Sequence, residues 1–136
     1  MINFKNTKKQ LLPEELSEFE KEQGFILPID YKSHILIYNG GKPDKDYFGD
    51  TRLSYFYPIK YGDSGTLEET LNVISDVLPD GFFPFAYDGG GNQICIALDE
   101  KNYGKIFIWY HDMDDDEDIE LLANSFKEFM NGLTEE

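Results

Sequence analysis

Histidine, serine and closely spaced carboxylates are the side chains of this sequence that could carry out chemistry. His111 precedes Asp112, and a histidine beside a carboxylate can act as a general base. No nucleophile or metal-ligand spacing accompanies this pair, so structural or surface roles are favoured for His111 and for His34. Ser64 lies in residues 62–65 (GDSG), which match the core of a serine-protease nucleophile loop. The chain is too short for the two barrels of such enzymes and has no G-x-S-x-G elbow, so a turn is expected.

Two further segments resemble ligand-binding loops. Asp112-x-Asp114-x-Asp116 begins like a calcium loop, but position six is Glu117 instead of Gly and position twelve is Ala123 instead of Glu. Residues 88–92 (DGGGN) are glycine-rich, yet they fit neither phosphate-loop motif and a strand is expected to follow them. We therefore expect no dedicated metal site, no cofactor, no catalytic residue and no enzyme activity.

The composition restricts the partners. The chain has 136 residues, with 27 Asp and Glu against 12 Lys and Arg, and a formal net charge of −15. One folded domain is expected at this length, because 40% hydrophobic and 15% aromatic residues suffice for a core. Nucleic acid and anionic membrane surfaces are disfavoured, since both require a basic footprint.

Nearly half of the net charge lies in one short tract. Seven acidic and no basic residues occur between positions 112 and 120, and this tract carries −7 of the −15. Like charges at this density predict an extended, solvated loop. Two interpretations remain open: a solvated loop without function, or a docking surface that attracts a basic partner.

Cysteine usage and the N-terminal segment indicate the compartment. Cys95 is the single cysteine and has apolar neighbours, so we expect a buried, unreactive thiol. The N-terminal lysines precede no apolar run, and no stretch reaches the ~20 apolar residues that span a bilayer. A cytoplasmic location is the expectation.

Helices are predicted at four places. Pro13 to Gln23 has an apolar stripe, a proline in its first turn and Gly24 at its end. A second helix is expected from Pro28 to Asn39. Capping boxes begin two more, at Thr66 and at Ser125.

Strands are predicted mainly in the second half. Arg52–Ile59 and Phe83–Tyr87 are rich in aromatic residues, and Pro84 favours an edge strand or a strand start for the latter. Gln93–Leu98 and Lys105–His111 are apolar on both faces, as central strands are. Lys42–Gly49 is expected to be a polar loop. The order of elements is typical of an α+β domain.

Several segments in series resemble one known family, the Smi/Knr-type branch of the SUKH superfamily. The matching segments are residues 27–32 (LPIDYK), 39–43 (NGGKP), 84–92 (PFAYDGGGN), 103–112 (YGKIFIWYHD) and 125–129 (SFKEF). The resemblance implies one α+β domain with helices packed on a mostly antiparallel sheet of about six strands. It also implies architectural roles for Pro28, Gly40, Gly41, Gly90, Asn92, Trp109 and Phe126.

The functional implication of the resemblance is binding rather than catalysis. Small bacterial members are typically immunity proteins that neutralise polymorphic toxin domains, often nucleases, whereas fungal members are regulators of cell-wall assembly. The leading hypothesis is an immunity-type protein for a basic, possibly nuclease, toxin domain, and the alternative is a regulatory scaffold. The sequence leaves the oligomeric state open.

Two groups of residues are candidates for contacting the partner. The acidic tract supplies long-range attraction, and exposed aromatic residues supply anchors, because buried aromatic side chains dominate interface energies. The candidate residues are Asp112, Asp114, Asp115, Asp116, Glu117, Asp118, Tyr47, Phe48 and Tyr55.

Overall fold

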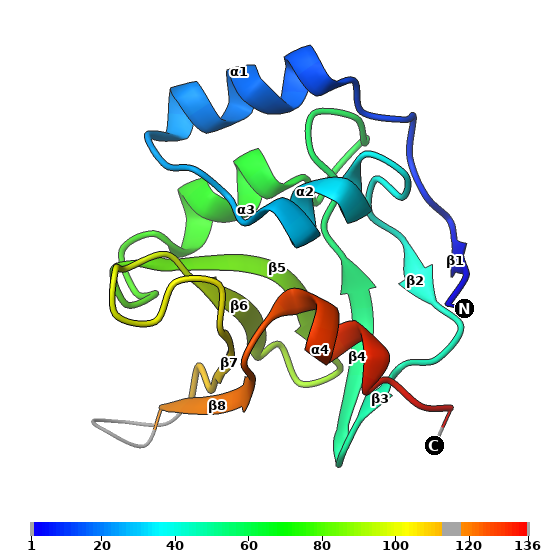
Figure 1. The fold of residues 1–136 in the computed structure, drawn as a ribbon, viewed down its shortest axis with the longest axis vertical. Helices are drawn as coiled ribbons and strands as arrows, with labels where there is room; N and C mark the ends of the chain where they lie inside the picture. Colours follow the sequence, from blue (N-terminus) through cyan, green and yellow to red (C-terminus); the bar gives the residue numbers. More distant parts are fainter. Residues whose placement is uncertain (1, 113–117, 136) are drawn as a thin grey trace.

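A six-stranded antiparallel sheet organises the computed structural model, which describes residues 2–112 and 118–135 (Figure 1). The strands lie side by side in chain order: β3 (Tyr47–Phe48), β4 (Thr51–Phe56), β5 (Phe82–Asp88), β6 (Gln93–Ala97), β7 (Ile106–Trp109) and β8 (Ile119–Ala123). A smaller sheet pairs β1 (Phe4–Lys5) with β2 (Lys42–Pro43). The helices are α1 (Pro13–Gln23), α2 (Ile29–Ile35), α3 (Leu67–Ile74) and α4 (Phe126–Asn131). The predicted α+β class and six-stranded sheet are confirmed.

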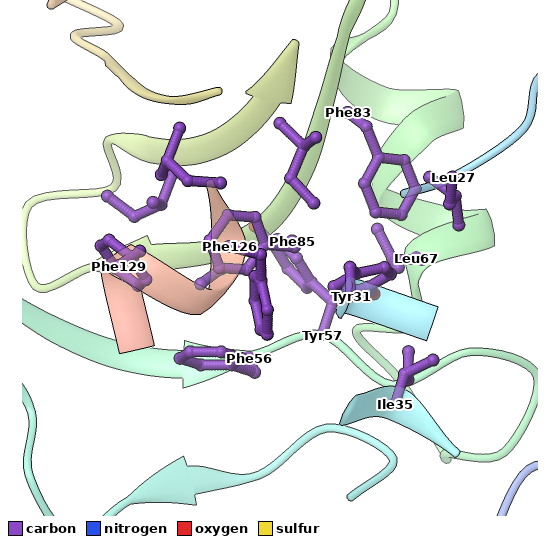
Figure 2. Packing of buried hydrophobic residues seen from close by; sticks show 14 of the residues in the cluster. Leu27, Tyr31, Ile35, Phe56, Tyr57, Leu67, Phe83, Phe85, Phe126 and Phe129 are labelled. Atoms are coloured by element: carbon purple, nitrogen blue, oxygen red, sulfur yellow. The ribbon is translucent and has the colours of Figure 1, made fainter. Parts of the chain in front are cut away.

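The main core lies between one face of the sheet and the helices. Buried residues of α1, α2 and α4 pack with strand residues such as Ile94. Figure 2 shows Tyr31 of α2 and Phe126 of α4 beside Phe85 of β5. The ring of Tyr31 meets those of Phe83 and Phe126 edge-on, with centroids 5.4 and 5.3 Å apart. Aromatic pairs at this spacing add to the stabilisation from burial alone.

A second apolar cluster covers the opposite face of the sheet. Cys95 and Trp109 pack there with Leu78, and Ile74 of α3 lies against them. Because alternate residues of a strand point to opposite faces, Ile94 and Cys95 enter different clusters. Burial on both faces confirms β6 as a central strand, and it confirms the buried Cys95, whose thiol pKa is raised by desolvation.

Local signals set the helix boundaries well. Helix α1 has the predicted bounds, and Gly24 ends it in the left-handed conformation at φ 81°. The backbone N–H of Glu69 donates to Thr66 Oγ1, and that of Glu128 donates to Ser125 Oγ, so both predicted N-caps are confirmed. Helix α2 is shorter than predicted and reaches only Ile35.

Three predictions about strands and loops were wrong. Residues 42–49 are not a polar loop, because they contain β2 and β3. The acidic tract does not extend as a loop to position 120, because Glu120 lies within β8. Pro84 marks neither a sheet edge nor a strand start: β5 lies between β4 and β6, and its pairing with β6 shifts between Pro84 and Ala86. This irregularity accommodates the missing proline N–H.

The buried side chain of Asn39 connects the N-terminal segment to the residues that follow β4. Asn39 Nδ2 donates to the carbonyls of Lys9 and Ile59, and its Oδ1 accepts from the N–H of Ile59. Gly40 and Gly41 follow at φ 77° and 102°. A Cβ on Gly41 would lie 2.6 Å from the carbonyl oxygen of Lys5, so the predicted architectural role of this pair has a steric cause.

Candidate protein-interaction surface

The acidic tract joins β7 to β8 at one end of the sheet. Asp112 is exposed, and Asp118 is half-buried, with its carbonyl accepting from the N–H of Tyr110. Asp114, Asp115, Asp116 and Glu117 lie outside the described residues. The hydroxyl of Tyr110 donates to Glu120 Oε1 at 2.8 Å, so this carboxylate is held on the strand. The role of the tract in binding stays a prediction.

A turn next to the tract uses His111 for structure. Both oxygens of Asp88 accept hydrogen bonds inside the turn, from the N–H groups of Gly90 and Asn92 and from Asn92 Nδ2. Asn92 Oδ1 accepts from the N–H of His111, and His111 Nε2 lies 2.9 Å from the carbonyl oxygen of Gly90. One ring nitrogen of His111 is therefore engaged by the backbone, which agrees with the structural role favoured by the sequence.

The architectural residues occupy mostly the expected places. Pro28 is the N-cap of α2, and Trp109 and Phe126 are buried. Asn92 connects the 88–92 turn to His111. The left-handed residue of the 88–92 turn is Gly91, at φ 86°, whereas Gly90 has no positive φ, so its architectural role stays a prediction.

The candidate aromatic anchors lie at the opposite edge of the sheet from β8. Phe48 on β3 is half-buried and stacks on Phe129 of α4, with centroids 4.8 Å apart. Tyr47 exchanges backbone hydrogen bonds with Thr134. Tyr55 on β4 is 36% exposed. In the order of strands these anchors are therefore at the other end from β8, and Tyr55 is the most accessible of them.

Charge is distributed unevenly between two parts of the chain. Residues 1–60, which form β1–β4, α1 and α2, contain nine acidic and nine basic residues and are neutral overall. Residues 61–126 contain fifteen acidic residues against Lys101 and Lys105, a formal charge of −13. They include α3 and β5–β8, shown from green to orange in Figure 1. The acidic character predicted for one loop thus extends over about half of the chain, from residue 61 to residue 126.

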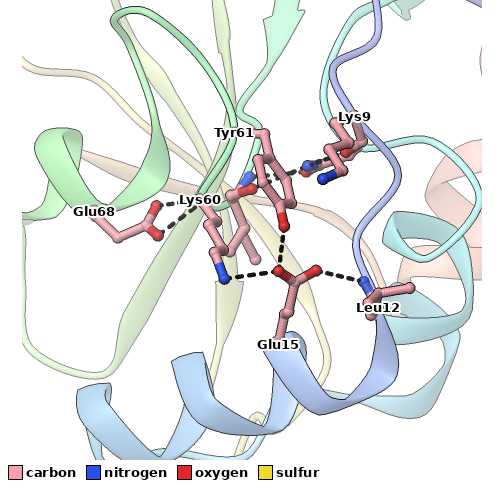
Figure 3. A network of polar contacts seen from close by, with 8 residues as sticks. Lys9, Leu12, Glu15, Lys60, Tyr61 and Glu68 are labelled. Carbon is pink, nitrogen blue, oxygen red and sulfur yellow. Dashed lines mark hydrogen bonds and ion pairs between the residues drawn. The ribbon is translucent and has the colours of Figure 1, made fainter.

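Within residues 1–60 three of the nine carboxylates form ion pairs with lysine or arginine in the described part of the structure. Glu15 on α1 accepts hydrogen bonds from Lys60, from the hydroxyl of Tyr61 and from the N–H of Leu12 (Figure 3). These donors lower the pKa of Glu15 to about 2. The cluster ties the start of α1 to residues 60 and 61, so it supports the fold.

The structure also presents a hollow that the sequence reasoning missed. It lies between α2 and α4 and is lined by His34, Lys45 and Lys127 among apolar side chains. The sequence did contain one signal for a surface here, since Ile29, Ser33 and Ile37 are spaced four residues apart. All three residues are exposed in the structure.

Among residues 2–112 and 118–135, no three His, Cys, Asp or Glu side chains are grouped so that they could hold a metal ion. None of the helices described is long and apolar enough to cross a bilayer.

Comparison with known proteins identifies relatives of the whole domain. The family model described as SMI1 / KNR4 family (SUKH-1) matches residues 10–132. A Bacillus subtilis (strain 168) protein, described as SPbeta prophage-derived uncharacterized protein YokK, is 35% identical over 147 residues. That match covers 90% of this chain and 74% of the Bacillus protein.

Proposed function

The chain belongs to the SMI1/KNR4 family (SUKH-1), and on this premise we propose that it is an immunity-type protein that neutralises a toxin domain by covering it. Members of this family generally act through protein–protein contacts and not through catalysis. The prophage-derived Bacillus relative is consistent with this role. We place the action in the cytoplasm, with a basic toxin domain, such as a nuclease, as the partner.

The observation that carries the proposal is the charge of −13 on residues 61–126. A field of one sign attracts a basic partner and raises its association rate by a factor of roughly 10–10³. A nuclease presents a basic surface to phosphate groups, and an acidic protein that covers this surface blocks access to the substrate. Asp112 and Asp118 flank the densest part of this field.

The first experiment is co-expression with the toxin domain encoded immediately upstream, scored as cell survival and co-purification. The decisive variant changes Asp114, Asp115, Asp116 and Asp118 to Asn. We expect its association rate to fall about tenfold and its dissociation rate to change less, because steering acts before contact. Surface plasmon resonance at two salt concentrations measures both rates.

A matched control removes the same charge from the neutral part of the chain. Glu14, Glu18, Glu22 and Asp50 are exposed, and changing each to its amide alters the net charge by the same amount. We expect this control to associate nearly as fast as the unmodified protein. An equal fall of the association rate in both variants would show that net charge governs association and that the position of the acidic residues does not. Cell survival without any complex between the two proteins would overturn the proposal.

A further inference from the structure

The hollow between α2 and α4 is an apolar groove with polar groups at defined places. It has a volume of about 500 Å³, within the range of protein binding pockets. Phe4 of β1 lies against it, with its ring centroid 4.9 Å from those of both His34 and Tyr38. Phe126 and Met130 of α4 line the other side. Segments from the start, the first third and the end of the chain thus form one groove.

His34 places an unsatisfied nitrogen among these aromatic rings. Its ring lies 5.1 Å from that of Phe126, and its Nε2 is buried without a hydrogen-bond partner among the described residues. Burial lowers the pKa of His34 to about 4, so the ring is neutral at neutral pH. A buried polar atom without a partner costs the fold free energy, so the neutral ring contributes to the groove as an aromatic surface.

The charges that line the groove are opposite in sign to the net charge of the chain. Lys45 and Lys127 line it, and neither forms an ion pair in the described part of the chain. Asp30 is the carboxylate beside them. Its Oδ1 accepts from the N–H of Tyr31 and its Oδ2 from the N–H of Lys127, so both oxygens are already engaged. The ammonium groups are available to an acidic ligand.

An exposed row of residues on α2 and just beyond its end extends the groove into a larger surface. Ile29 and Ile37 are 78% and 67% exposed, and Ser33 lies between them at helical spacing. Ser33 and Ile37 line the groove themselves. A ridge of residues four apart, next to a groove, is the surface against which a second helix packs.

We propose that the α2–α4 groove binds an amphipathic helix of a partner protein, with apolar side chains in the groove and flanking carboxylates on Lys45 and Lys127. A volume of about 500 Å³ accommodates a few apolar side chains rather than a whole domain. Apart from Phe126, the residues that line this groove lie outside residues 61–126, which carry the −13, and its ligand has the opposite charge. The inference therefore stands whether or not the chain neutralises a toxin.

The test uses two synthetic peptides that differ only in charge. One is a blocked helix with leucines at i, i+3, i+4 and i+7 flanked by glutamates, and its twin has lysine in place of each glutamate. Overall electrostatics of a −15 chain favours the lysine peptide, whereas the groove favours the glutamate peptide. We expect the glutamate peptide to bind at least about tenfold more tightly by fluorescence anisotropy, with amide shifts in α2 and α4.

Variants locate the interaction. Changing Lys45 and Lys127 to Gln should weaken the glutamate peptide about three- to tenfold, as expected for two partly exposed ion pairs. Changing the exposed Lys21 and Lys101 to Gln alters the net charge equally and should leave binding at the groove nearly unchanged. Ile37→Ser should weaken binding about tenfold through lost apolar contact, and its high exposure makes loss of the fold unexpected.

Three results would overturn the proposal. Tighter binding of the lysine peptide would show that net charge governs association. Equal effects of the two double-lysine variants would remove Lys45 and Lys127 from the interaction. Binding of dodecanoate in the groove, together with no binding of either peptide, would assign the groove to small amphipathic acids and exclude the helix.

Discussion

The two parts of the chain use their carboxylates in different ways. Every ion pair in the described part of the structure joins two residues of the first 60, as in Lys60 with Glu15 at 2.7 Å and Lys32 with Glu20 at 3.4 Å. In residues 61–126 the described carboxylates instead accept hydrogen bonds from backbone and hydroxyl groups, as Asp88 and Glu120 do, or face solvent. The same residue types thus stabilise the fold in one part and produce a long-range field in the other.

The difference extends to the surfaces that each part presents. The neutral part contributes most of the α2–α4 groove, where apolar contact and two free cations suit an acidic helix. The acidic part carries a charge of −13, whose main effect is to attract a basic partner at a distance. Substitutions of the ion-paired carboxylates should therefore change stability in the first part, and substitutions of carboxylates in the second part should change association. Three predictions on stability test this comparison.

The largest effect is expected at Asp46, in the neutral part. Its Oδ2 lies 3.2 Å from Arg52 Nε and 3.3 Å from Lys42 Nζ, and the residue is buried. Burial opposes ionisation, but the two cations outweigh it and hold the pKa of Asp46 below its usual value. Asp46→Asn should lower the free energy of unfolding by about 1.5–3 kcal/mol, the range for hydrogen bonds to charged groups. Urea denaturation measures the change.

The control for Asp46 is its near neighbour Asp50, which is exposed. Asp50→Asn removes the same charge without breaking a described ion pair, so we expect a change within about 0.5 kcal/mol. Equal losses in the two variants would contradict the assignment of the effect to the Lys42–Asp46–Arg52 cluster.

A smaller, pH-dependent effect is expected at Glu15. Its pKa is about 2 in the folded protein, against 4.5 as the ordinary value, so the folded state binds a proton less readily than the unfolded state. Its contribution to stability is therefore complete above about pH 5 and is lost as the pH falls toward 2. Glu15→Gln should be less stable than the unmodified protein at pH 7.

Urea denaturation from pH 7 to pH 2.5 tests this expectation. The difference in unfolding free energy between the two proteins should shrink steadily below about pH 5. Glu18 is exposed on the same helix, and Glu18→Gln should show no comparable trend. A difference that stays constant with pH would rule out the carboxylate as its cause.

The smallest effect on stability is expected in the acidic part, residues 61–126. Asp76, Asp99 and Asp112 are exposed, and changing all three to Asn removes like charges without breaking a described ion pair. We expect a change within about 0.5 kcal/mol, toward higher stability at low salt because repulsion is reduced. Thermal unfolding at low and high salt measures it. A clear loss of stability would show that these carboxylates support the fold after all.

Sequence alone determined the features that depend on neighbours in the chain. Pro13 and Gly24 bound α1 because each favours one backbone conformation, and Thr66 and Ser125 cap helices through bonds three residues away. Runs of apolar residues predicted the buried strands β6 and β7. The net charge of −15 follows directly from the counts of acidic and basic residues. The segments that resemble the SUKH superfamily were also visible without a structure, and the family match confirms them.

Tertiary structure decided what depends on contacts between distant segments. The two-residue strands β1 and β2 exist because residues about 38 positions apart in the chain pair with each other. A segment of two residues is too short to show the alternating pattern that predicts a strand. Pro84 lies inside the sheet at a place where the pairing with β6 shifts, a pattern that depends on the partner strand and not on the residues next to it in the chain. The α2–α4 groove needs Phe4, His34 and Phe126 together, and packing of three separate segments, rather than any local pattern, brings them there.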